Sequence, residues 1–346
     1  MPSIRGSVPC AMLIFAMLAS QAQSDETRAV KAIEAIKGRV EVDDEEPDDP
    51  VISVDLSTTD VTVSVLKALI ELKTLQTLDL RQSRVTDAGL KELRGIKSLR
   101  KLDLRQTQVT DACLAELIEL KNLEWLDLTF TQVTGNGLKE LKVLRKLQSL
   151  YLSGPKITDA CLDEVKELSS LQSLDLTATG ITDDGLKQLK NMKNLEKLVL
   201  ISTGITGSGL KELNQLDHLE ELNLGSTQVT DAGLKEITGF TQLWSLSLQD
   251  TKVTNAGIKE LQNLNDLQTL YLGETKVTDA GLEHLKGMTS LRVLSLDAAP
   301  VTDSGMKHLY GLANLESLSV ERTRVTSKER ESLRKALPDC SIKPEL

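Results

Sequence analysis

The sequence predicts an α/β solenoid with a parallel sheet on its concave face and short helices on its convex face. Three observations predict this fold. A leucine recurs every 24 residues from Leu75 to Leu315, each copy opens with an L-x-L alternation, and each copy closes with an apolar stripe at helical spacing. A copy this short cannot bury its own apolar side chains, so neighbouring copies must stack around one continuous core.

The first third of each copy predicts a short strand. We number Leu75 and its equivalents as position 1, so that positions 4 and 6 of that copy are Leu78 and Leu80. Apolar residues at alternate positions are typical of a strand with one buried face. Positions 3, 5, 7 and 8 have no place in this core, and we expect them to point to solvent on the concave face.

The second half of each copy predicts a short helix. Position 12 is always Thr, as in Thr86, and position 13 is usually Asp, as in Asp87. A Thr oxygen can accept an N–H at a helix start, and an Asp complements the positive end of the helix. Position 15 is usually Gly, replaced by Cys113 and Cys161 in two copies, and we expect this small residue to let helix and strand approach closely.

The ends of the array predict closing elements, because a solenoid needs caps over its exposed edges. We expect a helix ending near Gly38, a strand over residues 39–42 and a last helix over residues 327–336. The predicted organisation is a signal peptide at 1–22, an N-terminal cap with an acidic turn at 23–50, the solenoid at 51–326 and a C-terminal cap at 327–346.

The N-terminus predicts export. An apolar run from Val8 to Ala19 is too short to span a bilayer, which needs about 20 residues, and small residues precede a cleavage point after Ala22. We therefore expect a periplasmic, cell-envelope or secreted protein without stable membrane insertion after cleavage; the alternative is an uncleaved anchor. The cysteines beyond this segment have no spacing typical of a disulfide framework.

The run VTDAGLKEL at residues 85–93 resembles the leucine-rich repeat family. It is most similar to the 24-residue Thr-Asp-Ala-Gly type found in bacterial exported proteins, and to the ribonuclease-inhibitor-like repeats of F-box adaptors. The resemblance covers about residues 51–346 and implies a right-handed horseshoe whose role is protein–protein recognition. Where the family has Asn at position 9 this sequence mostly has Thr, so Thr hydroxyls are expected to replace the Asn ladder inside the turns.

Composition excludes several classes of function. The formal net charge is −10, whereas a general nucleic-acid binder needs a basic face, so we expect no nucleic-acid partner. Three histidines leave little material for a metal or acid–base centre, and neither a nucleophile elbow nor a metalloprotease motif occurs. We therefore expect neither enzymatic activity nor a cofactor or metal.

The concave face carries the candidate site. Position 5 begins with a row of aspartates that we expect to be solvated and compensated by arginines, the alternative being a site for a cation or a basic segment. Scarce aromatic residues fall nearby, with two apolar residues that we expect to be exposed, and clustered exposed apolar residues mark interfaces. The predicted partner-binding residues are Asp103, Arg105, Trp125, Asp127, Phe130, Tyr151, Val199 and Ile201.

The sequence thus predicts a non-catalytic scaffold that binds a protein partner on its concave strand face. The alternative is an exported glycan or cell-wall binding module, because Asp, Asn, Trp and Tyr side chains can hydrogen-bond sugars and stack on them.

Overall fold

The computed structural model describes residues 25–46 and 48–344. Within this part the chain forms two compact units. The N-terminal unit contains the described residues up to Asp127 together with Val143–Lys146, and the C-terminal unit contains Leu128–Lys142 and the described residues from Leu147 onward. Each unit is described by itself.

The N-terminal unit opens with a helical segment over residues 25–35. Its strands are β1 (Arg39–Val42), β2 (Val51–Asp55), β3 (Thr77–Asp79), β4 (Lys101–Asp103) and β5 (Trp125–Asp127). Its other helices are α2 (Val63–Ala68), η1 (Leu69–Glu71), α3 (Asp87–Leu90), η2 (Lys91–Gly95), η3 (Asp111–Cys113) and α4 (Leu114–Leu117), where η marks a 3₁₀ helix. Strands β2 to β5 pair in parallel, each with the next along the chain.

The C-terminal unit repeats the same strand–helix alternation. Its strands are β6 (Ser149–Tyr151), β7 (Ser173–Asp175), β8 (Lys197–Val199), β9 (Glu221–Asn223), β10 (Ser245–Ser247), β11 (Thr269–Tyr271), β12 (Val293–Ser295), β13 (Ser317–Ser319) and β14 (Ser341–Lys343). Its α-helices are α5 (Asp159–Val165), α6 (Asp183–Leu186), α7 (Asp231–Leu234), α8 (Asn255–Glu260), α9 (Asp279–Leu282), α10 (Asp303–Met306) and α11 (Ser327–Ala336). Its 3₁₀ helices are η5 (Leu189–Asn191), η6 (Leu210–Gln215), η7 (Lys235–Ile237), η8 (Leu261–Asn263) and η9 (Glu283–Leu285), while η4 (Leu138–Val143) ends in a residue of the N-terminal unit.

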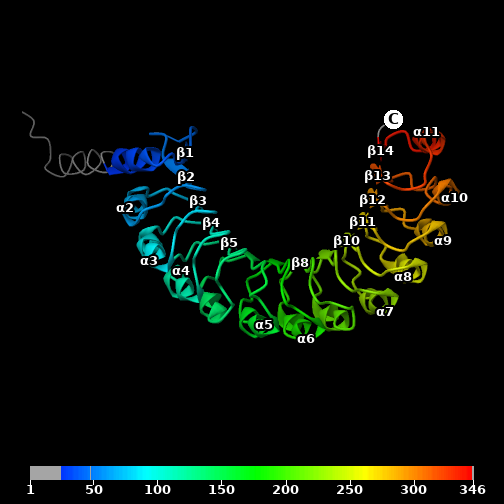
Figure 1. The fold of residues 1–346 in the computed structure, drawn as a ribbon, viewed down its shortest axis with the longest axis horizontal. Coiled ribbons are helices and arrows are strands. Elements are labelled where there is room, and N and C mark those ends of the chain that lie inside the picture. Colours follow the sequence, from blue (N-terminus) through cyan, green and yellow to red (C-terminus); the bar gives the residue numbers. More distant parts are fainter. Residues whose placement is uncertain (1–24, 47, 345–346) are drawn as a thin grey trace, which may run out of the picture. The chain divides into compact units, whose positions relative to one another are not determined.

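The predicted α/β solenoid is confirmed. In the C-terminal unit the strands line the inner side of the curve and helices α5 to α11 line its outer side (Figure 1). We call the surface that carries positions 3, 5 and 7 the strand face, and the opposite surface the helix face. Successive strands pair in register, so that equivalent positions of neighbouring copies lie side by side, as Leu246 lies between Leu222 and Leu270.

The core is the one that the repeat predicts. In the copy that starts at Leu75, the side chains at positions 1, 4 and 6 are fully buried, as are those of Leu90 and Leu93 at positions 16 and 19. Burying an aliphatic side chain of this size contributes about 1.5–3 kcal/mol. Because every copy brings the same set, this aliphatic layer continues from strand to strand.

The repeated Thr-Asp pair joins neighbouring copies, a role that the helix-start interpretation missed. The carboxylate of Asp87 accepts the backbone N–H and the hydroxyl of Thr110, the position-12 Thr of the next copy, both at 2.8 Å. The same pair of hydrogen bonds recurs at Asp159–Thr182, Asp183–Thr206, Asp231–Thr254, Asp279–Thr302 and Asp303–Thr326. At Asn255–Thr278 the Asn oxygen accepts the N–H of Thr278, and the Asn amide nitrogen donates to its hydroxyl. We call this series the Asp–Thr ladder. The capping role is confirmed in part, since Thr110 also accepts the N–H of Ala112.

Asp183 accepts four hydrogen bonds from the next copy. It accepts the hydroxyl of Thr206 at 2.5 Å and its N–H at 3.1 Å, and also the N–H groups of Gly207 and Gly209 at 3.2 and 3.0 Å. Burial alone would raise the pKa of this carboxyl, but the hydrogen bonds outweigh it and lower the pKa below its usual 3.8. Gly207 has φ +108°, a conformation that a side chain would strain, which explains why this copy has Gly rather than Asp at position 13.

The glycine at position 15 makes room for the ladder, not for the strand as we expected. A Cβ on Gly257 would lie 2.5 Å from Asp231 Oδ1, and a Cβ on Gly305 would lie equally close to Asp279 Oδ1. The close approach is therefore between the helix starts of adjacent copies. Cys161 occupies position 15 in a copy that follows one with Gly135 in place of the ladder aspartate. A Cβ added to Gly135 would lie 2.4 Å from the Cβ of Cys161.

The threonines at position 9 act within their own copy. The hydroxyl of Thr107 donates to the carbonyl of Leu104 at 2.7 Å, and Thr179 and Thr251 make the same bond three residues back. They therefore hold each turn closed locally rather than forming a ladder between copies. The residue before them, at position 8, adopts a left-handed backbone conformation even where it is not glycine.

The predicted end elements are present. Strand β1 covers the expected residues 39–42 and pairs antiparallel with β2, and α11 covers Ser327–Ala336 as expected. After α11, strand β14 pairs in parallel with β13, which places Ile342 beside Leu318 in the core. The signal peptide predicted at 1–22 lies outside the described residues.

Candidate functional site

In the N-terminal unit the aspartates at position 5 form a row along the strand face. Register places Asp55, Asp79, Asp103 and Asp127 side by side in β2 to β5. Arginines compensate the row, as predicted: Arg39 contacts Asp55 at 2.6 Å, Arg81 contacts Asp79 at 3.0 Å, and Arg105 contacts both Asp103 and Asp127.

Two aspartates of this row are buried, contrary to our expectation. Asp103 and Asp127 are only 5% and 3% exposed, so the prediction of a solvated row is wrong for them. Arg105 covers both: its Nε lies 3.0 Å from each oxygen of Asp103 and 3.3 Å from Asp127 Oδ2. A buried carboxylate needs such a partner, because desolvation otherwise penalises the charge. The hydrogen bond to Asp103 raises the pKa of the Arg105 guanidinium above its usual value.

The pKa values of Asp79 and Asp55, two neighbouring carboxyls of the row, are shifted in opposite directions. Burial raises the pKa of Asp79, and the neighbouring carboxylates of Asp103 and Asp55 add to this, against the hydrogen bond from the Arg81 backbone. At Asp55, burial also acts to raise the pKa, but hydrogen bonds from Ser57 and Arg39 lower it overall. Like charges in register are thus tolerated because each carboxylate has donors of its own.

Trp125 lies beside this row in β5. The ammonium of Lys101 in β4 sits 4.4 Å from the centroid of the indole ring, a cation–π contact. The Trp125 side chain is half-buried, and Lys101 is exposed. The structure thus brings Trp125, Asp103, Arg105 and Asp127 onto one surface. The indole of Trp125 and the cations of Lys101 and Arg105 lie at its outer side.

The other predicted residues belong to the C-terminal unit. Phe130 at position 8 is 49% exposed and has φ 53°, which is costly for a residue with a large side chain. Tyr151 and Ile201 are half-buried. Val199 is only 8% exposed, so the prediction that it is exposed is wrong; Asp175 and Asn223 flank it in register on the adjacent strands. The expected joint patch therefore divides between the two units, and it remains a prediction.

A hollow of about 280 Å³ on the strand face of β8 to β11 was not predicted. Asn223 and Ser247 at position 5 help to line its floor, and Trp244 and Tyr271 also line it. Small residues at equivalent positions of adjacent strands leave this space open. The pattern was visible in the sequence, since position 5 reads Val, Asn, Ser and Tyr in successive copies from Val199 to Tyr271.

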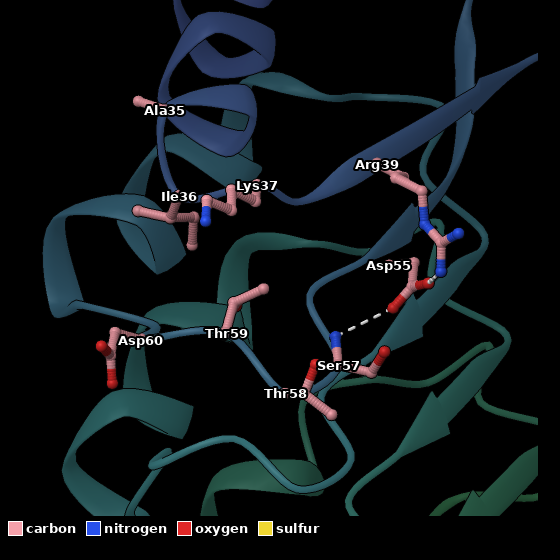
Figure 2. Close-up of a pocket in the computed structure, with 9 residues that line it drawn as sticks. All are labelled: Ala35, Ile36, Lys37, Arg39, Asp55, Ser57, Thr58, Thr59 and Asp60. Carbon is pink, nitrogen blue, oxygen red and sulfur yellow. Dashed lines mark hydrogen bonds and ion pairs between the residues drawn. The ribbon is translucent and has the colours of Figure 1, made fainter.

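A larger hollow of about 670 Å³ lies in the N-terminal unit, between the end of the first helix and the turn after β2. Figure 2 shows Ile36 and Lys37 on one side of this hollow and Thr59 on the other. Its charged pair is satisfied internally, because Arg39 contacts Asp55 and Asp55 also accepts the N–H of Ser57 at 2.8 Å.

Other chemistry has little support among the described residues. No group of three or more His, Cys, Asp or Glu side chains there is arranged to hold a metal ion. The side chains of Cys113, Cys161 and Cys340 are buried, and burial raises the pKa of Cys340 to about 11. No helix in residues 25–46 or 48–344 combines the length and apolar character needed to cross a bilayer.

The comparisons with known proteins agree with this fold. A family model described as Leucine Rich repeat matches residues 71–93, 167–190 and 215–237. Among curated proteins no significant match is found. An internalin from Listeria monocytogenes superposes with a TM-score of 0.64 at 19% identity, covering 92% of this chain and 94% of that chain.

Two further solved structures are similar. A leucine-rich repeat protein of Leptospira interrogans has a TM-score of 0.57 at 26% identity, covering 80% of this chain and 74% of that chain. A receptor solved as a TLR13–ssRNA13 complex has a TM-score of 0.56 at 19% identity, covering 80% of this chain and 43% of that chain. The three matched repeats and the shared fold together identify the fold of this chain as a leucine-rich repeat solenoid.

Proposed function

We propose that the protein is a non-catalytic recognition scaffold that binds a protein partner on its strand face. One observation carries this proposal: in copy after copy the core positions are aliphatic and buried, whereas the strand-face positions vary in size, charge and aromaticity. Leucine-rich repeat proteins are generally recognition scaffolds, which supports the same function. The net charge of −10 favours a protein partner over nucleic acid.

Each unit offers anchors of the kind that dominate protein interfaces, where Trp, Tyr and Arg are enriched. In the N-terminal unit these are Trp125, stacked against Lys101, and Arg105, whose side chain is 39% exposed. Asp103 and Asp127 hold Arg105 in place, which reduces the entropy lost when a partner binds it. In the C-terminal unit the anchors are Phe130, Tyr151 and Ile201.

Site-specific photo-crosslinking in the native host tests the proposed face. A photoreactive amino acid is placed at Trp125 or Tyr151 on the strand face, and at Tyr310, which is 37% exposed on the helix side, as the control. We expect a discrete protein adduct from the strand-face positions and none from Tyr310. Adducts only from Tyr310, or none from any position, would contradict binding through the strand face.

We also propose that the chain is exported and that residues 1–22 are removed. The support is the apolar run from Val8 to Ala19 followed by small residues. Mass spectrometry of the protein from envelope and secreted fractions should find a mature N-terminus at Gln23. Recovery of the intact N-terminus from the cytoplasm would contradict export.

A further inference from the structure

The hollow on β8 to β11 is defined by side chains from adjacent strands. Register aligns Lys197, Glu221, Ser245 and Thr269 in one row, and Val199, Asn223, Ser247 and Tyr271 in the next. The hollow takes up about 280 Å³ over these rows, with Trp244 also lining it. All of these residues belong to the C-terminal unit.

Several uncharged polar groups of this hollow have no hydrogen-bond partner within the described chain. Ser247 is only 8% exposed, yet its hydroxyl makes no hydrogen bond to the protein, although it lines the open space. The half-exposed hydroxyls of Ser245 and Thr269 also make no hydrogen bond to the described residues, and neither does the amide nitrogen of Asn223, whose oxygen accepts the N–H of Gly225 at 3.0 Å. These groups face the open space of the hollow, where water reaches them, and a ligand that displaces this water must offer hydrogen bonds in its place.

The charges that line the hollow are paired. Lys197 Nζ lies 2.7 Å from Glu221 Oε2, so the lining cation and carboxylate neutralise each other. Trp244 is fixed by a hydrogen bond of 3.1 Å from its indole nitrogen to Glu220. Tyr271 is 37% exposed, and its phenol makes no hydrogen bond to the described protein. The site therefore offers aromatic rings and uncharged hydrogen-bonding groups, without an unpaired charge to attract an ion.

We propose that this hollow binds a neutral saccharide. A hydroxyl both donates and accepts, so Ser245, Ser247 and Thr269 match a ligand that carries hydroxyls on successive carbons. The ring of Tyr271 provides a face for the C–H groups of a sugar ring. The volume lies near the lower limit of small-ligand pockets, about 300 Å³, which suits one or two sugar units.

The polar groups that line the hollow favour a saccharide over an apolar side chain of a protein partner. A protein hot spot inserts an aromatic or aliphatic side chain into a dry pocket, which would leave these hydroxyls and the Asn223 amide unpaired. A saccharide satisfies them instead. This inference goes beyond the proposed protein recognition, because it assigns a separate ligand class to one stretch of the strand face.

An array of neutral glycans, probed with the full chain and followed by titration calorimetry of the best oligosaccharide, tests the inference. The variants are Tyr271→Ala and Ser247→Val, with Tyr310→Ala as a control of equal exposure. Val is already present at the same strand position in β8, as Val199, so Ser247→Val fills the hollow with a side chain that this position accommodates. Ser247→Ala, which only removes the hydroxyl, guards against misfolding of the larger variant.

We expect the wild type and Tyr310→Ala to bind a neutral oligosaccharide with equal affinity. Tyr271→Ala and Ser247→Val should weaken binding at least tenfold, and Ser247→Ala several-fold, with unchanged circular dichroism. The inference is overturned if no neutral glycan binds the wild type, or if the hollow variants bind as well as Tyr310→Ala. Loss of the protein crosslink in Ser247→Val without glycan binding by the wild type would also overturn it, since the hollow would then serve the protein partner.

Discussion

The Asp–Thr ladder predicts a specific cost for removing one of its carboxylates. In the Asp231→Ala variant, Thr254 loses two hydrogen bonds of 2.7 Å, one from its N–H and one from its hydroxyl. Hydrogen bonds to charged groups contribute about 1.5–3 kcal/mol each, and water reaches this half-buried site in part, so we expect a loss of about 2–4 kcal/mol.

The chain contains its own control for this substitution. Asn255 already replaces the aspartate in the next copy, and it bonds both the N–H and the hydroxyl of Thr278 at 2.8 Å. Asp231→Asn should therefore rebuild the same pair of bonds and cost at most about 1 kcal/mol. Thr254→Val removes only the hydroxyl bond, and combining it with Asp231→Ala completes a double-mutant cycle.

Two measurements read out the effect. Urea unfolding followed by circular dichroism gives the change in stability, and hydrogen exchange at the Thr254 amide gives the local change even if the array unfolds in steps. The reasoning is refuted if Asp231→Ala and Asp231→Asn unfold within 0.5 kcal/mol of each other, on the order of the error of such comparisons, while the Thr254 amide keeps its protection.

Further predictions concern packing and pH. Gly257→Ala should lower the melting temperature because its Cβ would meet Asp231, whereas Gly311→Ala, with nothing within 4 Å, should not. Leu174→Ala, at a fully buried site, should cost about 2–5 kcal/mol in a urea titration, and an unchanged midpoint would contradict its burial. Asp183→Asn should destabilise at neutral pH, and thermal melts should show the deficit shrinking as the pH falls below about 3.8, since the lowered pKa means that the wild type loses this stabilisation there. Asp79→Asn should show the opposite sign, a gain at neutral pH that disappears as the pH falls towards 3.8, since its pKa is raised; a pH-independent difference would contradict either prediction.

The sequence predicted the core well because the core depends on periodicity. Leu78 and its equivalents are buried because strand alternation and the repeat both require it, and each repeat reinforces the next. The end strand at 39–42 and the last helix at 327–336 were predicted for a similar reason, since local start and stop residues mark them.

Contacts between copies were harder to predict. Asp231 lies at a helix start, where a carboxylate is favourable in any case, so nothing in a single copy indicates that it bonds Thr254 in the next. The same limit explains Val199 and Asp103, whose burial depends on the side chains of adjacent strands. The hollow under Tyr271 likewise exists only because small residues coincide on neighbouring strands.

The ladder has a consequence for how such a chain can change its length. Because Asp231 and Asn255 each make hydrogen bonds to both the N–H and the hydroxyl oxygen of the following Thr, excising residues 243–266 as a cassette would bring Asp231 to Thr278 with equivalent geometry. Whole copies are thus interchangeable modules, while a deletion of any other length would misalign both edges of the core. Duplication or loss of a module would redraw the recognition surface in a single genetic step and leave the chemistry that joins its neighbours intact.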